Sequence, residues 1–277
     1  VETPRLLHLW HLSSLDAPTV AVVWSLAFAW SVRIVLPSWV PILLALGTWT
    51  VYVVDRLLDA RAGVKANALN TLRERHFFHW RHRHTLTPLV VLAACSAAVM
   101  VFTLMPIPNR EHNTILAAVA FTYFSGVHGP RRVPRRVAEI LTKELIVGVL
   151  FTTGCALPTL SRIRLEASDT ETLWLLVPAL IFFVALGWLN CHAIDRWECG
   201  ACKSRSGIAA GLLACIGLGV AASLAHGQPR TAALFAAGAV SAVMLALLHT
   251  TRARLTPLTL RAAADLALVM PLVLVLR

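Results

Sequence analysis

Two aspartates, Asp55 and Asp59, lie four residues apart at the end of a long apolar stretch that covers residues 39–58. On a helix, this spacing places both carboxylates on the same face. A charged residue at the centre of a membrane-spanning helix costs about 2.5–3.5 kcal/mol, so such a residue usually has a function. Two carboxylates on one face can share a hard divalent cation such as Mg²⁺. We therefore predict that Asp55 and Asp59 are catalytic residues that bind a metal ion.

A purely structural role for these two aspartates is the alternative. They would then lie just beyond the membrane span and pair with Arg56 or Arg61. Thr48 and Tyr52 continue the same helical stripe toward the middle of the span, so the polar face extends into the bilayer. This extension favours a metal or substrate site, and we expect Tyr52 to contact a substrate.

A second polar cluster, Asn190, Asp195 and Glu198, follows the apolar stretch at residues 173–194 in the same manner. Asp195 and Glu198 are three residues apart and would lie on one helical face. By analogy with the first cluster, we predict that both acids bind metal and that Asn190 assists catalysis. A solvated loop in which Asp195 pairs with Arg196 is the alternative.

The composition is that of a membrane protein. The chain has 277 residues, of which 57% are hydrophobic and 14% charged, and its mean hydropathy is +0.70. Soluble domains carry about 25% charged residues. The apolar runs are too long and too uniform for barrel strands, so the spanning segments should be helices. The predicted spans are residues 16–36, 39–58, 86–107, 113–127, 138–158, 173–194, 207–225, 231–249 and 258–276. We expect an all-α polytopic membrane protein with nine transmembrane helices around a central cavity, forming one domain over residues 1–277.

Basic residues are distributed unevenly between the two sides of the membrane. The net charge is +11, and nine spans place 19 of the 25 Lys and Arg residues on one side. The other side carries Arg33, Arg110, Arg162, Arg164, Arg230 and Arg277. The positive-inside rule then predicts a cytoplasmic N-terminus, both acidic clusters at the cytoplasmic face and an external C-terminus. The first span is long enough to cross the bilayer and does not read as a cleavable signal peptide. The charge reflects topology, and we expect no nucleic-acid partner.

Basic side chains beside the acidic clusters would suit a diphosphate, which carries several negative charges. Arg56 and Arg61 flank the first cluster, and Lys203 and Arg205 follow the second. Carboxylate-bound Mg²⁺ would neutralise part of a diphosphate and these cations the rest. We predict that all four bind substrate, although membrane topology alone also accounts for basic residues at these positions.

Lys143 is a further candidate for substrate binding. It lies about two turns inside the span that begins near residue 138, beyond the basic pair Arg135 and Arg136. The alternative is a self-paired stripe, because Arg135, Glu139 and Lys143 follow one another at intervals of four residues.

Other polar groups receive a structural interpretation. Arg261 and Asp265 are four residues apart at the start of the last span and should pair with each other. Cys199 and Cys202 form a single CxxC, which is a weak signal for zinc or redox chemistry. Residues 72–84 are rich in arginine, histidine and aromatic residues, which is typical of a helix that lies on the membrane surface.

Nine helices with an aspartate motif ending the second and another ending the sixth resemble the UbiA superfamily of intramembrane prenyltransferases. The first motif of that family reads Asn-Asp-x-x-Asp-x-x-x-Asp. Asp55 and Asp59 match its last two aspartates, whereas Val51 and Tyr52 replace the leading Asn-Asp. By topology, the resemblance covers essentially the whole chain.

The other motifs of the family are kept only in part. The second reads Asp-x-x-x-Asp, and here Asp195 matches its first acid while Cys199 replaces the other, with Glu198 one position early. A Tyr-x-x-x-Lys follows the fourth span in the family. Its tyrosine falls on Tyr123, but its lysine falls on a valine, so we expect His128 or Arg131 to take its place in substrate binding.

This resemblance implies a Mg²⁺-dependent enzyme of a bacterial inner membrane. The enzyme would transfer a prenyl group from a prenyl diphosphate to a lipophilic or aromatic acceptor in the membrane. One Mg²⁺ would be held by Asp55 and Asp59, and a second by Asp195 and Glu198. The alternatives are an intramembrane terpene cyclase of the same fold and a non-catalytic protein that binds or transports lipid. The altered second motif favours the non-catalytic alternative.

Overall fold

The computed structural model describes residues 5–65, 73–111, 113–115, 117–118, 143–166, 170–198 and 205–276, and the regular elements in these ranges are all helices. The first five are α1 (Arg5–Leu12), α2 (Asp16–Ser31), α3 (Trp39–Lys65), α4 (Glu74–Arg81) and α5 (Arg83–Leu104). After residue 142 follow α8 (Lys143–Glu166), α9 (Thr170–Glu198), α10 (Ser206–Leu224) and α11 (Pro229–Thr251). The chain ends with a 3-10 turn, η2 (Arg252–Arg254), then α12 (Pro257–Ala267) and α13 (Leu272–Val275).

Seven helices in the described part of the chain are long and apolar enough to cross a membrane, which fits the predicted all-α polytopic membrane protein. They cover Trp39–Lys65, Arg83–Leu104, Lys143–Ile163, Leu173–Glu198, Ser206–Leu224, Pro229–Arg254 and Pro257–Val275. Each overlaps one predicted span. The first predicted span corresponds to α2, which meets α1 at an 87° bend, and this pair would make an eighth span. The span predicted at 113–127 lies mostly outside the described residues, so nine spans remain a prediction.

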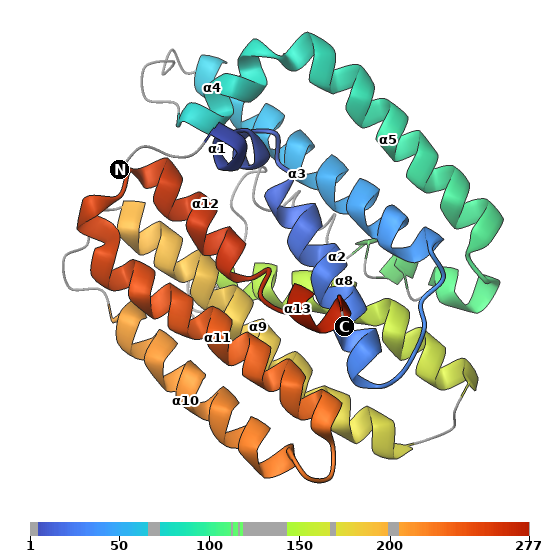
Figure 1. Cartoon of the computed structure of the whole chain (residues 1–277). Helices are drawn as coiled ribbons and strands as arrows, with labels where there is room; N and C mark the ends of the chain where they lie inside the picture. Colours follow the sequence, from blue (N-terminus) through green and yellow to red (C-terminus); the bar gives the residue numbers. More distant parts are fainter. Residues whose placement is uncertain are drawn as a thin grey trace, which may run out of the picture.

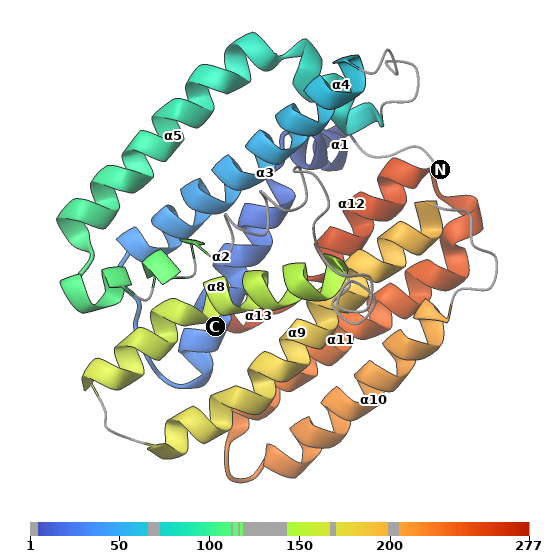
Figure 2. The ribbon, with the colours of Figure 1, turned by 180° about the vertical axis from the view of Figure 1, so that it is seen from behind.

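The helices form a bundle with α2 and α8 near its middle (Figures 1 and 2). On one side α10 packs against α11, and α9 contacts both of them and α8. On the other side α3 packs against α5 and α2. The short helices α1 and α4 lie together at one end of the bundle, where α12 begins. That end carries the residues of both acidic clusters that the structure describes.

Aromatic side chains join α2 to α9 in the core. The ring of Trp24 lies edge-on to that of Phe183, with centroids 4.8 Å apart, and Phe28 packs against Phe183 at 5.1 Å. All three side chains are fully buried. The indole of Trp24 donates a hydrogen bond to the carbonyl of Leu268 at 2.9 Å, so its one polar atom is satisfied. This core fixes α2 between α9 and the end of α12.

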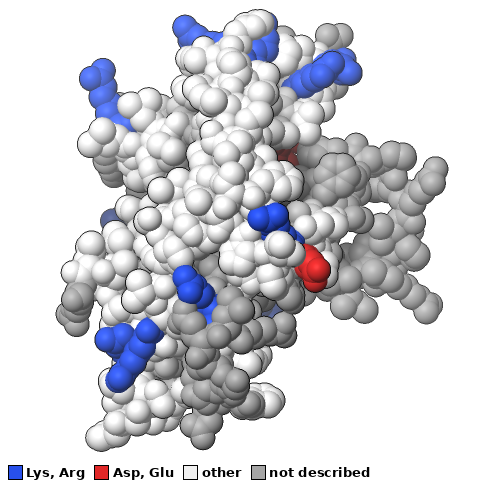
Figure 3. All heavy atoms as spheres, turned by 90° about the vertical axis from the view of Figure 1, so that its right-hand side faces the viewer, with Lys and Arg blue, Asp and Glu red and all other residues white. Residues whose placement is uncertain are grey.

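The outer surface of the bundle is apolar where a bilayer would contact it. Figure 3 shows a broad face with few charged side chains. Large apolar side chains point outward from two outer helices, among them Leu92 and Phe102 on α5 and Leu212 and Ile216 on α10. A soluble protein rarely exposes so continuous an apolar surface. Lipid is the solvent that suits this face.

Replacing Gly148 by alanine should destabilise the bundle, because α8 and α9 approach each other closely at this residue. A Cβ there would lie 3.0 Å from the backbone nitrogen of Trp188 and 3.0 Å from the carbonyl of Val184. Backbone atoms of a helix yield little, and overpacking of this kind costs about 1–3 kcal/mol. Gly219→Ala is the matched control, since a Cβ at that residue meets nothing within 4 Å. Thermal denaturation in detergent should show a lower midpoint for Gly148→Ala alone; equal midpoints would contradict the close approach.

Candidate functional site

A long cavity of about 770 Å³ lies between α3, the end of α5 and α8. Its wall is mainly apolar, with Leu43 and Val51 on α3 and Leu150 and Phe151 on α8. The lining of α8 extends from Lys143 to Arg162. At 1.5 Å per residue this distance is about 28 Å, which is close to the thickness of the hydrocarbon core of a bilayer. The cavity therefore has the length and polarity to hold an extended hydrocarbon chain.

Three of the predicted site residues line this cavity together. Asp55 and Tyr52 contribute from α3, and Lys143 contributes from the first residue of α8. They supply a carboxylate, a phenol and an ammonium group to a mainly apolar space, whose lining also includes Arg110 and Arg162. Oxygen ligands suit a hard cation, and an ammonium group suits a phosphate. The chemistry predicted for Asp55, Tyr52 and Lys143 is thus possible at one place.

Asp59 and Arg61 lie outside the lining of the cavity. The carboxylate of Asp59 faces α4, where its Oδ2 is 4.0 Å from Nε2 of His76. The side chain of Arg61 is exposed. Asp59 lies one helical turn beyond Asp55 on α3, past the cavity and near the end of the bundle.

The second acidic cluster also lies outside the lining of this cavity. Asn190 is buried and donates a hydrogen bond from Nδ2 to Oδ1 of Asp265 at 3.0 Å. Asp195 is exposed. Glu198 accepts ion pairs from Arg73 and Arg261, both at 2.7 Å. Among the described residues, the structure therefore does not bring the two acidic clusters to one cavity.

The remaining predicted site residues are placed as follows. Arg205 is exposed, directly before α10. Four other candidates lie outside the described residues, namely Tyr123, His128, Arg131 and Lys203. The CxxC cysteines, Cys199 and Cys202, lie outside them as well.

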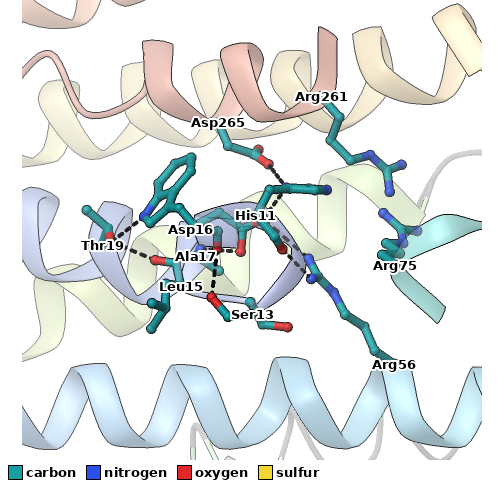
Figure 4. Close-up of polar contacts among 12 residues, drawn as sticks. His11, Ser13, Leu15, Asp16, Ala17, Thr19, Arg56, Arg75, Arg261 and Asp265 are labelled. Atoms are coloured by element: carbon teal, nitrogen blue, oxygen red, sulfur yellow. Dashed lines mark hydrogen bonds and ion pairs between the residues drawn. The ribbon is translucent and has the colours of Figure 1, made fainter. Parts of the chain in front are cut away.

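A buried polar network that the sequence analysis missed lies beside the cavity (Figure 4). Nδ1 of His11 is 2.7 Å from Oδ2 of Asp16 and 3.6 Å from Oδ2 of Asp265. Arg56 donates to the carbonyl of His11 at 2.9 Å and to Oδ2 of Asp16 at 3.3 Å. The side chains of His11, Asp16 and Arg56 are almost completely buried. The network joins α1, α2, α3 and α12 by charge-assisted bonds.

Backbone geometry explains how these residues meet. The bend between α1 and α2 places His11 over the start of α2, where Asp16 also accepts a hydrogen bond from the amide of Ala17 at 2.9 Å. Arg56 follows Asp55 on α3, and successive helical residues are turned by about 100°. Asp55 therefore faces the cavity while Arg56 faces α1 and α2.

The predicted pairing of Arg261 with Asp265 is replaced by contacts between helices. Arg261 binds Glu198 on α9, and Asp265 accepts from Asn190 and approaches His11. Ligand atoms of His11, Asp16 and Asp265 lie within 4.8 Å of one another, which is close enough for one metal ion. The guanidinium of Arg56 already pairs with the carboxylate of Asp16. The same residues can therefore also be explained as an ion-pair network without a metal ion.

Helix α4 connects the ends of α3 and α9. Arg73, just before α4, binds Glu198, and His76 approaches Asp59. His79 is buried, its Nδ1 lies 2.7 Å from the carbonyl of Arg75, and its Nε2 lies 3.0 Å from the hydroxyl of Ser14. Burial, then the nearby arginines, lowers the pKa of His79 to about 4, against the hydrogen bond to Arg75. Burial and the neighbouring guanidinium of Arg75 likewise lower the pKa of His76 to about 4.

The stability of the protein should therefore fall between pH 7 and pH 5. The unfolded chain binds protons at these histidines near pH 6.5, whereas the folded chain binds them only near pH 4. For His79 alone this difference removes roughly 1–2 kcal/mol of stability between pH 7 and pH 5. The thermal denaturation midpoint should depend less on pH in His79→Gln than in the parent. His82→Gln, at an exposed position after α4, is the control; a change of slope as large as that of His79→Gln would refute this assignment.

The arrangement can bind an extended apolar chain in the cavity and an anionic or metal-bound group beside Asp55 and Lys143. The same end of the bundle carries the buried network and the arginines around Glu198. No family model, curated protein or solved structure matches the chain.

Proposed function

We propose that the protein is a Mg²⁺-dependent intramembrane prenyltransferase, related to the UbiA superfamily. The observation that supports this function best is the cavity between α3 and α8, which combines a long apolar wall with Asp55, Tyr52 and Lys143. A prenyl diphosphate has a matching form, with a hydrocarbon tail and a charged head. The tail would lie along α8, and the diphosphate would lie beside Lys143.

The donor atoms in the cavity fit a magnesium ion. Mg²⁺ in proteins is usually held by one or two carboxylates together with substrate phosphates and water, and Asp55 supplies one carboxylate in the lining. Bound there, the ion would stabilise negative charge on the leaving diphosphate. Asp55 would hold it, and the ammonium group of Lys143 would pair with a phosphate oxygen.

In the proposed reaction the bond between the allylic carbon and the diphosphate oxygen breaks, and diphosphate leaves with the electron pair. The acceptor then forms a bond to the allylic carbon and loses a proton. The apolar wall would keep water away from the allylic cation, and the ring of Phe151 would offer a π-face to it. We expect this chemistry at the cytoplasmic side of a bacterial inner membrane, with the N-terminus inside and the C-terminus outside.

A non-catalytic lipid-binding protein is the second candidate. The position of Glu198 favours it, because Arg73 and Arg261 already neutralise that acid. Asp195, the other acid of the second cluster, is exposed and lies outside the lining.

Release of diphosphate separates the two candidates. Purified protein would be incubated with Mg²⁺ and allylic diphosphates of increasing chain length, with and without a membrane extract as the source of acceptor. The proposed enzyme should release diphosphate faster than the same detergent without protein, and EDTA should stop the release. Binding of the isoprenoid tail without any release would support the lipid-binding candidate instead.

A further inference from the structure

Four arginines gather where α3, α4, α9 and α12 meet, and we call them the arginine cluster: Arg56, Arg73, Arg75 and Arg261. They come from three separate parts of the chain. Figure 4 shows the guanidinium groups of Arg56, Arg75 and Arg261 on the same side of His11. Those of Arg75 and Arg261 point toward one another, and that of Arg56 points to Asp16. Like charges repel at such a place unless anions lie among them.

Among the described residues, the carboxylates do not balance this cluster. Arg56 binds Asp16, whereas Arg73 and Arg261 share Glu198. Asp265, the third acid nearby, contacts Asn190 and His11. Four guanidinium groups thus face three carboxylates in the described part of the chain.

Arg75 is the member of the cluster that binds no carboxylate among the described residues. Its Nε donates to Nε2 of His76 at 2.9 Å, an interaction that leaves the positive charge unpaired. Its side chain is half-buried, and burial together with Arg56 and Arg73 lowers its pKa to about 10, against the opposing effect of Glu198 and Asp265. Nε of Arg261 is also buried without a hydrogen-bond acceptor in the described part of the structure. Both groups have donors to spare.

We propose that Arg75, with Arg56 and Arg261, binds an oxyanion of the phosphate class. Guanidinium groups match phosphate oxygens in both geometry and charge. The site is separate from the Mg²⁺ site proposed at Asp55, because Arg56 and Asp55 point to different sides of α3. The site therefore binds its anion without metal. The proposal of this site does not depend on whether the protein transfers a prenyl group. A metal ion at His11, Asp16 and Asp265 would add to the excess positive charge. This excess therefore argues against a metal ion there.

Binding of inorganic diphosphate in the presence of EDTA tests this site directly. Titration calorimetry in detergent, with sodium chloride matched for ionic strength as the blank, would give the affinity of the parent. Arg75→Ala should weaken binding at least tenfold. Arg81→Ala, an exposed arginine at the end of the same helix, is the control and should stay within twofold of the parent. No binding to the parent, or equal losses in both variants, would overturn the proposal.

Glu198→Gln gives a second test with the opposite sign. Glu198 competes with the anion for the arginines, so removing its charge should tighten metal-free diphosphate binding by about threefold or more. A metal-ligand role for Glu198 predicts no such gain under EDTA. If Arg75→Ala does not fold, Arg75→Lys keeps the charge without the planar fork and should still bind several-fold more weakly than the parent. Unchanged binding in Arg75→Lys and in Glu198→Gln would refute the site.

The anion has two sources, a free phosphate or the headgroup of an anionic lipid, since this end of the bundle is predicted to face the cytoplasmic membrane surface. Protein in nanodiscs of phosphatidylglycerol or of phosphatidylcholine would distinguish them. Loss of inorganic diphosphate binding only in phosphatidylglycerol identifies a headgroup, and retention in both lipids identifies a soluble anion. Either result supports the site, provided that Arg75→Ala abolishes the diphosphate binding that the parent shows. Diphosphate binding that survives Arg75→Ala rules the site out.

Discussion

Asp55→Asn should lower the Mg²⁺-dependent release of diphosphate by 100-fold or more. Asp55 is the one carboxylate in the lining of the cavity among the described residues, and a neutral amide is a poor ligand for a hard cation. Loss of a group that stabilises charge in a transition state commonly costs about 10²–10³ in rate. Rates of release from an allylic diphosphate at saturating Mg²⁺ would measure the effect. The fold should be retained, because the cavity wall around Asp55 is unchanged.

Asp195→Asn is the control for this prediction. Asp195 is exposed and lies outside the lining, so the variant should stay within about threefold of the parent rate. The family resemblance predicts a different result for Asp195→Asn, because it assigns Asp195 to a second metal ion. Both variants would then show a severe loss of activity. Equal losses would show that the two acidic clusters act together during the reaction. A parent-like rate in Asp55→Asn would remove the basis for catalysis in the cavity.

The apolar stretches of the sequence predicted the helices well, because the length of a hydrophobic run is a local property. Each of the seven long helices overlaps a predicted span, and the basic segment at residues 72–84 contains α4. The ends of these helices were harder to predict. The stretch that ends near residue 58 continues as α3 to Lys65, since polar residues extend a helix once water can solvate them.

The buried network could not be predicted from the sequence, because its members are far apart along the chain. His11 meets Asp265 across most of the sequence, and only the bend between α1 and α2 brings it there. No short spacing marks such a group. A charged residue at the first position of an apolar span, Asp16, was the one available signal, because a carboxylate there must find a partner.

Local spacing also gave one wrong pairing. Arg261 and Asp265 are four residues apart, but such a helical pair stabilises by only about 0.2–0.5 kcal/mol. Contacts with other helices are more favourable when they satisfy charges that would otherwise be buried alone. Arg261 therefore binds Glu198, and Asp265 turns to Asn190 and His11. For Arg261 and Asp265, partners on other helices thus outweigh the neighbour on the same helix.

Asp16→Ala should cause the largest loss of stability among single substitutions in the network. The carboxylate of Asp16 lies between His11 and Arg56, at 2.7 Å and 3.3 Å, and all three side chains are buried. Without it, the carbonyl of His11 is the one partner that the guanidinium of Arg56 keeps among the described residues. Removal of one member of a buried ion pair costs about 3–5 kcal/mol, because the other charge is left uncompensated. The thermal denaturation midpoint in detergent should fall by on the order of 10 °C.

Two further variants show whether the lost ion pair is the cause. Glu74→Ala removes the exposed pair between Glu74 and His8, which is 2.9 Å long, and exposed pairs stabilise by about 0–1 kcal/mol. Its midpoint should stay close to that of the parent. Adding Arg56→Met to Asp16→Ala should restore part of the loss, since the unpaired guanidinium is then replaced by an apolar chain of similar length. If Asp16→Ala melts like Glu74→Ala, or if the double variant is less stable than Asp16→Ala alone, the network does not hold α1, α2 and α3 together in the way these distances indicate.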